Sequence, residues 1–484
     1  MEKYLSRGYY PTIGIECHVQ LKTKTKLFSG VLNDARDADP NTLISPICVG
    51  LPGTLPVLNQ EAVSLAIVAG LALRADVASI SHFDRKHYFY PDLPKGYQIT
   101  QLHYPIIEGG VVETIMDDGS DLEVKITRAH LEEDAGKSTH PAGADYSLVD
   151  LNRAGTPLLE IVSEPDIHSA AEAKAYAHEL YLLMKYSGVS EADLYHGNMR
   201  FDVNISLSKD LKKLGTRAEI KNINSFKAVE KAVEYEIKRQ ADLLDRGSEI
   251  VQETRGWDDS KQKTISQRSK EDAHDYRYFP DPDIPPVLVT KEVIAATAEV
   301  MPLLPSMLRE IFGELGLDNQ KIATILDEPE MADIIRYSAE AHDQKTAQTI
   351  ANWCLGELQR LALEKEISWS EVSRGLDNLV TLAAMVDGDK LSSSASKDLL
   401  LEIVKKNKDP EELAKAKNLL QVSDESDLIM IIEEVLDSNQ KAADDVRGGE
   451  LKAIGFLVGQ VMKASKGRAN PAKVQELIKK QLGI

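Results

Sequence analysis

The first half of the chain alternates apolar and polar residues with a period of two, which predicts half-buried β-strands. Between residues 13 and 21 the odd positions are apolar, and the even positions hold Gly14, Glu16, His18 and Gln20. Residues 199–207 repeat this pattern, and residues 122–132 and 217–223 alternate as well. Each segment therefore predicts a strand with one core face and one polar face.

Helices are expected between these strands. Residues 170–186 are apolar at helical spacing, follow Ser169 as an N-cap, and end near Gly188. Residues 227–246 show the same spacing and stop at Gly247. The mixture of strands and helices predicts an α+β domain that extends to about residue 293.

A proline-rich passage, FPDPDIPP at residues 279–286, is expected to close this domain in an extended conformation. Beyond Thr290 the strand signals nearly vanish, and amphipathic helical stretches follow with breaks near 302–305, 327–329 and 388–390. We therefore expect an α+β domain followed by an all-helical second half.

Composition limits the classes of function. The three cysteines, Cys17, Cys48 and Cys354, lie far apart, which fits a reducing cytosol better than a disulfide framework. No apolar run predicts a signal peptide or a membrane span, so a cytoplasmic protein is expected. The net charge of −20 predicts that any RNA contact is confined to a local patch.

The C-terminal tail is the candidate for that patch. From Arg447 to Ile484 it carries eight basic and two acidic residues, a net charge of +6. Such a bias favours contact with phosphates, although a solvated helical face is the simpler alternative.

The polar strand faces hold the candidate chemistry. Glu16 and His18 lie two apart on one strand, so a carboxylate and an imidazole point the same way, as in half of a divalent-metal site. Taken alone, this pair is more typical of a solvated strand face.

Two further carboxylates interrupt apolar strands. The strand period places His130 and Glu132 on the apolar side with Leu122, Val124 and Ile126. Such a position suits a ligand role, and an acidic loop without a ligand stays open as the alternative. Glu160 sits within the apolar run 158–162 and needs a cation, a metal or a proton. The alternative for Glu160 is a buried ion pair with Arg153 or another base.

A basic and amide-rich segment precedes the second helix. Arg217, Glu219 and Lys221 share one strand face, and Asn222 and Asn224 follow them directly before the helix begins. Basic and amide groups before a helix N-terminus suit a phosphate, although simple capping by Ser225 is the alternative. The chain has no P-loop, because the stretch ending at Lys137 lacks the upstream glycine.

Two loops mix aromatic and basic residues: RKHYFYPDLPKGYQITQ at 85–101 and HDYRYFP at 274–280. Such loops suit a subunit interface or a nucleic-acid contact, and packing at a domain edge is the alternative.

Eight blocks occur in register along the chain and together resemble the signature of the B subunits of the aspartyl/glutamyl-tRNA amidotransferase family. They are IGIECHVQL, RKHYFYPDLPKGYQITQ, HLEEDAGKS, DLNRAGTPLLEIVSEPDI, MRFDVNIS, AEIKNINSF, HDYRYFPDPDIPP and GFLVGQVMKASKGRANP. The resemblance covers nearly the whole chain. It implies an α+β cradle-like catalytic domain at 1–293 followed by all-α helical and tail domains at 294–408 and 409–484.

The resemblance implies an enzyme that uses ATP and Mg²⁺ to phosphorylate the side-chain carboxylate of Glu-tRNA(Gln) or Asp-tRNA(Asn), which ammonia then converts to the amide. It implies a separate glutaminase, the A subunit, that supplies ammonia through a channel, and a small C subunit. The glutamyl- or aspartyl-tRNA synthetase is a further candidate partner. Whether the glutamine route, the asparagine route or both are used stays open.

The resemblance also assigns candidate roles. The catalytic and metal-binding set is Glu16, His18, Glu132, Glu160 and Glu219. The set expected to bind ATP phosphates or substrate is Lys137, Arg217, Lys221, Asn222 and Asn224. The ammonia path or subunit interface is assigned to Lys86, Tyr88, Lys95 and Tyr97, and tRNA contact to Arg447, Lys463, Lys466 and Arg468.

One departure from the family matters. Many members carry paired cysteines that bind zinc ahead of the glycine-leucine-proline-glycine block, but here that region contains only Cys48. A tetrahedral cysteine site cannot be built from it, so no structural zinc is expected. In addition, His87 stands where many relatives have asparagine.

Two rival functions remain at this level. A free-standing ATP-dependent ligase or kinase would share the metal site but would not need the long helical tail. A non-enzymatic RNA-binding protein would use the tail but leave the carboxylates of the strand faces without a role.

Overall fold

The structure is a computed structural model that describes residues 5, 7–141, 143–269, 275–421, 425–448, 452–465 and 469–483. The chain forms two compact units, Met1–Ser306 and Met307–Ile484. Within the described residues, no helix is both long and apolar enough to cross a membrane.

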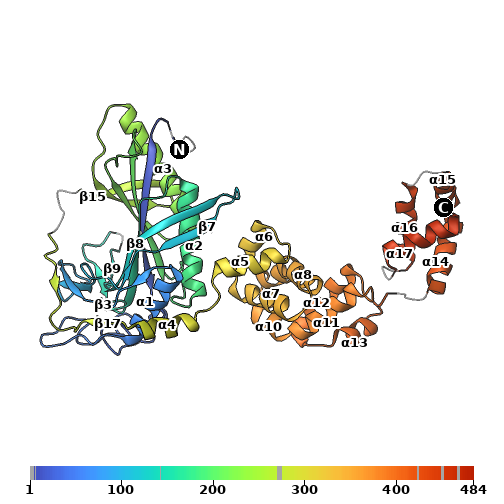
Figure 1. Ribbon diagram of the computed structural model, residues 1–484, viewed down its shortest axis with the longest axis horizontal. Helices are drawn as coiled ribbons and strands as arrows, with labels where there is room; N and C mark the ends of the chain where they lie inside the picture. Colours follow the sequence, from blue (N-terminus) through green and yellow to red (C-terminus); the bar gives the residue numbers. More distant parts are fainter. Residues whose placement is uncertain are drawn as a thin grey trace. The chain divides into compact units, whose positions relative to one another are not determined.

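The first unit is built on a ten-stranded sheet (Figure 1). In spatial order its main path is β15 (Lys263–Ser269), β14 (Glu253–Asp258), β13 (Ala218–Ile223), β12 (Met199–Ser208), β1 (Tyr10–Gln20), β11 (Pro157–Ser163), β8 (Asp121–Glu133), β6 (Ile107–Glu108) and β2 (Asp76–Val77), with β7 (Val111–Ile115) paired to β8. The alternating strand β1 is central and pairs antiparallel with both β11 and β12. Its polar face therefore meets residues from two neighbouring strands.

Small sheets add the loops that surround this face. They are β16 (Phe279–Pro280) with β4 (Asp84–His87) and β5 (Tyr97–Thr100), β9 (Lys137–Thr139) with β10 (Leu148–Asp150), and β3 (Ile80–Ser81) with β17 (Val287–Leu288). The proline-rich segment thus pairs with the aromatic loop through β16 and β4.

Helices cover the apolar face of the large sheet. The hydrophobic core joins the odd residues of β1 to α1 (Gln60–Ala72), α2 (Ala170–Tyr186) and α3 (Phe226–Asp245) (Figure 1). The hydroxyls of Ser169 and Ser225 accept hydrogen bonds from the backbone N–H groups of Glu172 and Ala228, which confirms both predicted helix starts.

The predicted face of His130 and Glu132 is wrong. Arg128 pairs with Val162, but the next pair joins Ile126 to Ser163, so β8 contains one extra residue at this point. Such a β-bulge reverses the alternation that follows it. Ile126 and Ala129 consequently both enter the core, and His130 and Glu132 turn to the polar face.

The second unit contains helices. With α4 (Lys291–Glu299), which belongs to the first unit, the helices beyond residue 290 are α5 (Pro305–Glu314), α6 (Asn319–Leu326), α7 (Pro329–Ala341), α8 (Gln344–Trp353), the π-helix η3 (Cys354–Leu358), α9 (Gln359–Leu363), α10 (Trp369–Arg374), α11 (Leu376–Asp387), α12 (Ser393–Lys406), α13 (Pro410–Ala416), α14 (Glu425–Ser438), α15 (Gln440–Arg447), α16 (Ala453–Ala464) and α17 (Pro471–Leu482). Every named element of the described chain beyond residue 290 is helical, and the predicted breaks fall between helices. The last four helices enclose their own apolar cluster. The domain boundaries at 293 and 408 stay predictions.

Candidate active site

Residues on the polar face of β1 line three cavities, which follow one another along the strand. Gly14 and Glu16 line a cavity of about 240 Å³, which we name the Glu16 cavity. His18 lines a cavity of about 610 Å³, the His18 cavity, and Gln20 lines one of about 470 Å³, the Gln20 cavity. Alternate residues of a strand lie about 7 Å apart, so the cavities follow one another along the strand.

The His18 cavity holds a cluster suited to a cation. His18 lies opposite Glu160 on β11, and Glu160 lies opposite His130 on β8. His18 Nε2 is 3.3 Å from Glu160 Oε2 and 3.8 Å from Glu132 Oε1. Ligand atoms of His18, Glu132 and Glu160 all lie within 4.8 Å of one another. We call these three residues the His18 triad.

His130 is a second imidazole at this cluster. Its Nε2 is 3.6 Å from Glu160 and 3.8 Å from Glu132, and its buried Nδ1 has no hydrogen-bond partner among the described residues. His130 was not among the predicted site residues, because the strand period places it on the core face. The available signal was the spacing, since His130 and Glu132 repeat the two-residue separation of Glu16 and His18.

Glu160 does form a buried ion pair with bases, as the alternative expected, but these bases are imidazoles and not Arg153. Arg153 Nε lies 3.3 Å from Asp134 instead, and the guanidinium donates to the backbone carbonyls of Ala135 and Gly136. The ion pairs of Glu160 within the described residues are with the two imidazoles, His18 and His130.

The charged groups at the His18 triad shift one another's pKa values. Burial alone would lower the pKa of His18, but the hydrogen bond to Glu160 and the charges of Glu160 and Glu132 raise it to about 9. Burial would raise the pKa of Glu160, but His130 and His18 hold it well below its usual range. In the metal-free protein, protonated imidazole thus neutralises the carboxylates that a metal ion would otherwise neutralise.

A second cluster lies one step along β1. Ligand atoms of Glu16, Asp202 and Glu219 lie within 4.8 Å of one another, and we call these residues the Glu16 triad. Lys221 Nζ is 2.7 Å from Asp202 and 2.9 Å from Glu219. Asn204 Nδ2 donates to Glu16 across 2.8 Å. Asp202 lies on the polar face of the predicted strand 199–207, but it was not among the predicted site residues.

The lysine changes the electrostatics of the Glu16 triad. Burial, followed by the charges of Glu160 and Glu219, raises the pKa of Glu16. Burial would also raise the pKa of Glu219, but Lys221 holds it below its usual value. Burial would lower the pKa of Lys221, but Asp202 and Glu219 raise it. Lys221 therefore supplies the Glu16 triad with a fixed positive charge.

The five residues of the predicted catalytic set thus divide between two adjacent triads on one sheet face. Glu16 and Glu219 belong to one triad, and His18, Glu132 and Glu160 belong to the other.

The residues predicted to bind phosphates spread over all three cavities. Lys221, Asn222 and Asn224 line the His18 cavity, Arg217 lines the Glu16 cavity, and Lys137 lines the Gln20 cavity.

Two residues of the aromatic loop reach the His18 cavity. Lys86 and Tyr88 line it, and Lys86 Nζ lies 4.9 Å from the ring centroid of Tyr276. Lys95 forms an ion pair with Glu133, and its Nζ lies 5.3 Å from the ring centroid of Tyr97. Burial would lower the pKa of Lys86, but the charge of Glu132 and its other neighbours raise it.

The tail residues are only partly placed. Arg447 ends α15 and forms an exposed ion pair with Asp444 at 2.8 Å, and Lys463 lies in the last turn of α16. Lys466 and Arg468 lie outside the described residues. Contact between this tail and RNA stays a prediction.

Cys48 lies beside a hydroxyl and a buried lysine. Its Sγ lies 3.2 Å from the hydroxyl of Ser45 and 3.6 Å from Lys26 Nζ. Lys26 is fully buried and donates to the carbonyls of Leu43 and Ala154 at 2.7 Å. The absence of a structural zinc stays a prediction.

Comparison with known proteins settles the family. Residues 11–295 match the family model described as the GatB/GatE catalytic domain, and residues 336–482 match the model described as the GatB domain. The chain belongs to the GatB/GatE family.

Relatives of the same family match over almost their full length. A protein of Carboxydothermus hydrogenoformans is 44% identical over 483 residues, covering 98% of this chain and 99% of the relative. One from Trichodesmium erythraeum is 43% identical over 98% of both chains, and one from Coxiella burnetii is 46% identical over 98% of this chain and 99% of the relative. All three are named as the B subunit of an aspartyl/glutamyl-tRNA(Asn/Gln) amidotransferase. The family resemblance of the eight sequence blocks is thereby confirmed.

Proposed function

We propose that this chain is the B subunit of a tRNA-dependent amidotransferase that acts on Glu-tRNA(Gln), Asp-tRNA(Asn) or both. The His18 triad carries the proposal, because it gathers two carboxylates and an imidazole in a cavity of about 610 Å³ beside the cationic side chain of Lys221. Full-length relatives named for this activity support it.

The proposed reaction has two steps. In the first, an oxygen of the aminoacyl side-chain carboxylate attacks the γ-phosphorus of ATP, and ADP leaves. In the second, ammonia attacks the carbonyl carbon of the acyl phosphate, phosphate leaves, and the amide remains. Phosphoryl transfer requires chiefly positioning and neutralisation of charge, which suits a site without a protein nucleophile.

The His18 triad fits Mg²⁺. Two of its three donors are carboxylates, which Mg²⁺ prefers, and the adjoining cavity leaves room for the waters that this ion keeps. When bound, the ion would neutralise charge on the phosphates of ATP. His130 would orient Glu160 and Glu132 from the side away from β1.

The remaining polar residues would position the two substrates. Lys221 presents fixed positive charge at the edge of the His18 cavity, and Asn222 and Asn224 supply amide groups there for phosphate oxygens. Arg217 would do the same from the Glu16 cavity. Glu16, Asp202 and Glu219 would hold Lys221 in place.

Lys86 and Tyr88 would guide ammonia into the His18 cavity from a glutaminase subunit, which a small third subunit joins to this chain. Their polar ends on apolar stems suit a narrow hydrophilic passage. If so, Lys86→Ala should depress amidation with glutamine far more than amidation with free ammonium. Equal loss with both nitrogen sources would exclude this role.

The helical tail, residues 409–484, would bind the tRNA. Removing residues 410–484 should raise the dissociation constant for tRNA and flatten its dependence on salt, because phosphate contacts release counterions. Unchanged affinity at moderate salt would show that the tail is not the RNA-binding domain.

The main test is amidation by the purified heterotrimeric complex. With both mischarged tRNAs, ATP and glutamine present, we expect Gln-tRNA(Gln), Asn-tRNA(Asn) or both. ATP hydrolysis should require charged tRNA. Hydrolysis that ignores tRNA would favour the free-standing ligase or kinase, and no hydrolysis at all would favour the RNA-binding protein.

A further inference from the structure

A buried lysine and a buried cysteine meet in the loops between β1 and α1, and neither has a role in the proposed reaction. Lys26 is fully buried, Cys48 is 6% exposed, and Lys26 Nζ lies 3.6 Å from Cys48 Sγ. We call these two residues the Lys26–Cys48 pair.

All three donor positions of the Lys26 ammonium are occupied. Its Nζ donates to the carbonyl oxygens of Leu43 and Ala154 at 2.7 Å, and its third contact is with Cys48 Sγ. No carboxylate of the described residues lies within ion-pair distance of Lys26 Nζ. Burying an ammonium without an anion is costly, so the thiolate of Cys48 is the counter-charge that this site offers.

The sulfur of Cys48 is surrounded by hydrogen-bond donors. The hydroxyl of Ser45 lies 3.2 Å from Sγ and that of Ser29 lies 3.9 Å from it, in addition to Lys26 Nζ. Burial would raise the pKa of Cys48, but the hydrogen bond with Ser45 and the charge of Lys26 lower it. A thiolate can accept from all three groups, so the arrangement stabilises the reactive form of the cysteine.

The other two cysteines of the chain have no such stabilisation. Cys17 and Cys354 are fully buried, and burial raises the pKa of Cys354 to about 12 and that of Cys17 well above its ordinary value. Oxidation of cysteine follows thiolate content, so Cys48 is the cysteine of this chain that we expect to be oxidised first.

We propose that the Lys26–Cys48 pair is a site of reversible oxidation by hydrogen peroxide, which joins the two side chains through a sulfur–nitrogen bond. The Cys48 thiolate attacks one oxygen of the peroxide, the O–O bond breaks, and a sulfenic acid and hydroxide form. The hydroxide takes a proton from the Lys26 ammonium, which leaves water and a neutral amine. The amine nitrogen then attacks the sulfur, and the sulfenic hydroxyl leaves as water with a proton from the nitrogen.

The first step prepares the lysine for the second. Burial lowers the pKa of Lys26, and the charge of Cys48 is the largest effect that opposes this. Conversion of the thiolate to a neutral sulfenic acid removes that charge, so the buried ammonium loses a proton and becomes a nucleophile. Because Nζ already lies beside Sγ, condensation can precede further oxidation of the sulfur.

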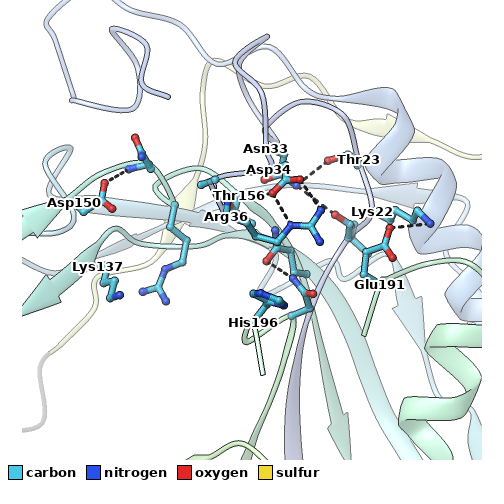
Figure 2. Close-up of a pocket in the computed structure, with 16 residues that line it drawn as sticks. Lys22, Thr23, Asn33, Asp34, Arg36, Lys137, Asp150, Thr156, Glu191 and His196 are labelled. Carbon is cyan, nitrogen blue, oxygen red and sulfur yellow. Dashed lines mark hydrogen bonds and ion pairs between the residues drawn. The ribbon is translucent and has the colours of Figure 1, made fainter. Parts of the chain in front are cut away.

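The new bond would alter the wall of the Gln20 cavity. Lys26 holds the carbonyls of Leu43 and Ala154, and the N–H group of Leu43 donates to Asn152 Oδ1 at 2.9 Å. Asn152 lines the Gln20 cavity together with Thr156 (Figure 2). A nitrogen drawn toward the sulfur weakens its hold on both carbonyls, so oxidation would loosen this wall.

Mass spectrometry of the assembled complex after exposure to hydrogen peroxide tests the proposal. Proteolysis should yield a cross-link between the peptides of Lys26 and Cys48, with a mass two hydrogen atoms below their sum. Dithiothreitol should reverse it, because its thiol attacks the sulfur and releases the amine. Cys48 should react at least about tenfold faster than Cys17 and Cys354, since the thiolate is the nucleophile.

Two variants separate the steps. Lys26→Arg keeps a positive charge beside the sulfur but supplies no neutral amine, so dimedone should label Cys48 as a sulfenic acid and no cross-link should form. Cys48→Ser should form neither product. The matched control is Lys24→Arg, which changes an exposed lysine two positions away and should leave the cross-link intact.

The measurement on the wild-type complex decides the outcome even if a variant fails to fold. A Cys48 that peroxide oxidises no faster than Cys354 would overturn the proposal. So would oxidation of Cys48 to a sulfinic acid with no bond to Lys26. The products are detected on the chain itself, so the result does not depend on the proposed amidation.

Discussion

The His18 triad and the Glu16 triad are built alike but neutralised differently. Each contains one residue of β1 and two acidic residues from other strands, with ligand atoms within 4.8 Å of one another. The Glu16 triad holds Lys221 between Asp202 and Glu219. The His18 triad contains the imidazole of His18 and faces that of His130, and no lysine lies within ion-pair distance of it in the described chain.

The comparison teaches that position on the sheet face does not by itself define a metal site. An ammonium within a carboxylate cluster competes with a metal ion, whereas imidazole becomes a ligand once it loses a proton. We therefore expect the His18 triad to recruit its positive charge from solution and the Glu16 triad to provide a permanent one. The two charges would flank the same phosphate groups.

The largest expected effect comes from Glu160→Gln, which removes one carboxylate of the His18 triad. Phosphorylation of the charged tRNA should fall at least a thousandfold, about 4 kcal/mol, because metal-assisted charge stabilisation contributes several kcal/mol. Single-turnover formation of the acyl phosphate measures it. Glu113→Gln, which changes an exposed carboxylate paired with Arg74, is the control. Glutaminase activity of the complex should persist, and a wild-type rate in Glu160→Gln would remove the triad from the mechanism.

The next effect comes from Lys221→Met, which removes the fixed charge from the Glu16 triad. Phosphoryl transfer should fall about a hundredfold, as is typical when one preorganised charge contact is lost. The emptied triad should also bind a cation, so the stoichiometry of bound Mn²⁺ in electron paramagnetic resonance should rise by one per chain. Lys221→Arg keeps the charge and should bind no additional ion. Unchanged stoichiometry in Lys221→Met would show that the two triads differ in more than the lysine.

A smaller effect is expected for His130→Gln, which leaves the His18 triad complete. Affinity for Mg²⁺ should weaken roughly 10- to 100-fold, the usual consequence of removing a group that orients metal ligands. The Mg²⁺ dependence of the phosphorylation rate measures it, and saturating Mg²⁺ should restore most of the rate. A rate that stays low at saturating Mg²⁺ would instead mean that His130 acts directly on the substrates.

The smallest effect is expected for Asn204→Ala, which removes the hydrogen bond to Glu16. Stability should decrease by about 1 kcal/mol, the net value of one such bond, and turnover should change by only a few-fold. Thermal unfolding and the amidation rate measure the two quantities. A loss of activity comparable with that of Glu160→Gln would mean that Glu16 belongs functionally to the His18 triad.

Much of this site could be predicted from local sequence. A period of two places Glu16, His18 and Gln20 on one face of β1 whatever the strand pairs with, because side chains alternate along any strand. The caps at Ser169 and Ser225 are equally local, since each depends on a hydroxyl three residues before a backbone N–H group.

Tertiary structure decided which residues meet. The extra residue in β8 reverses the faces of His130 and Glu132, and only its pairing with β11 reveals this, because a bulge is a property of two strands. Arg153, the sequence-based partner of Glu160, is instead held by Asp134 and two carbonyl groups. The division into two triads has the same origin. Strand alternation fixed the direction of each side chain on β1, but strand order and register determined whether it faces an imidazole or a lysine.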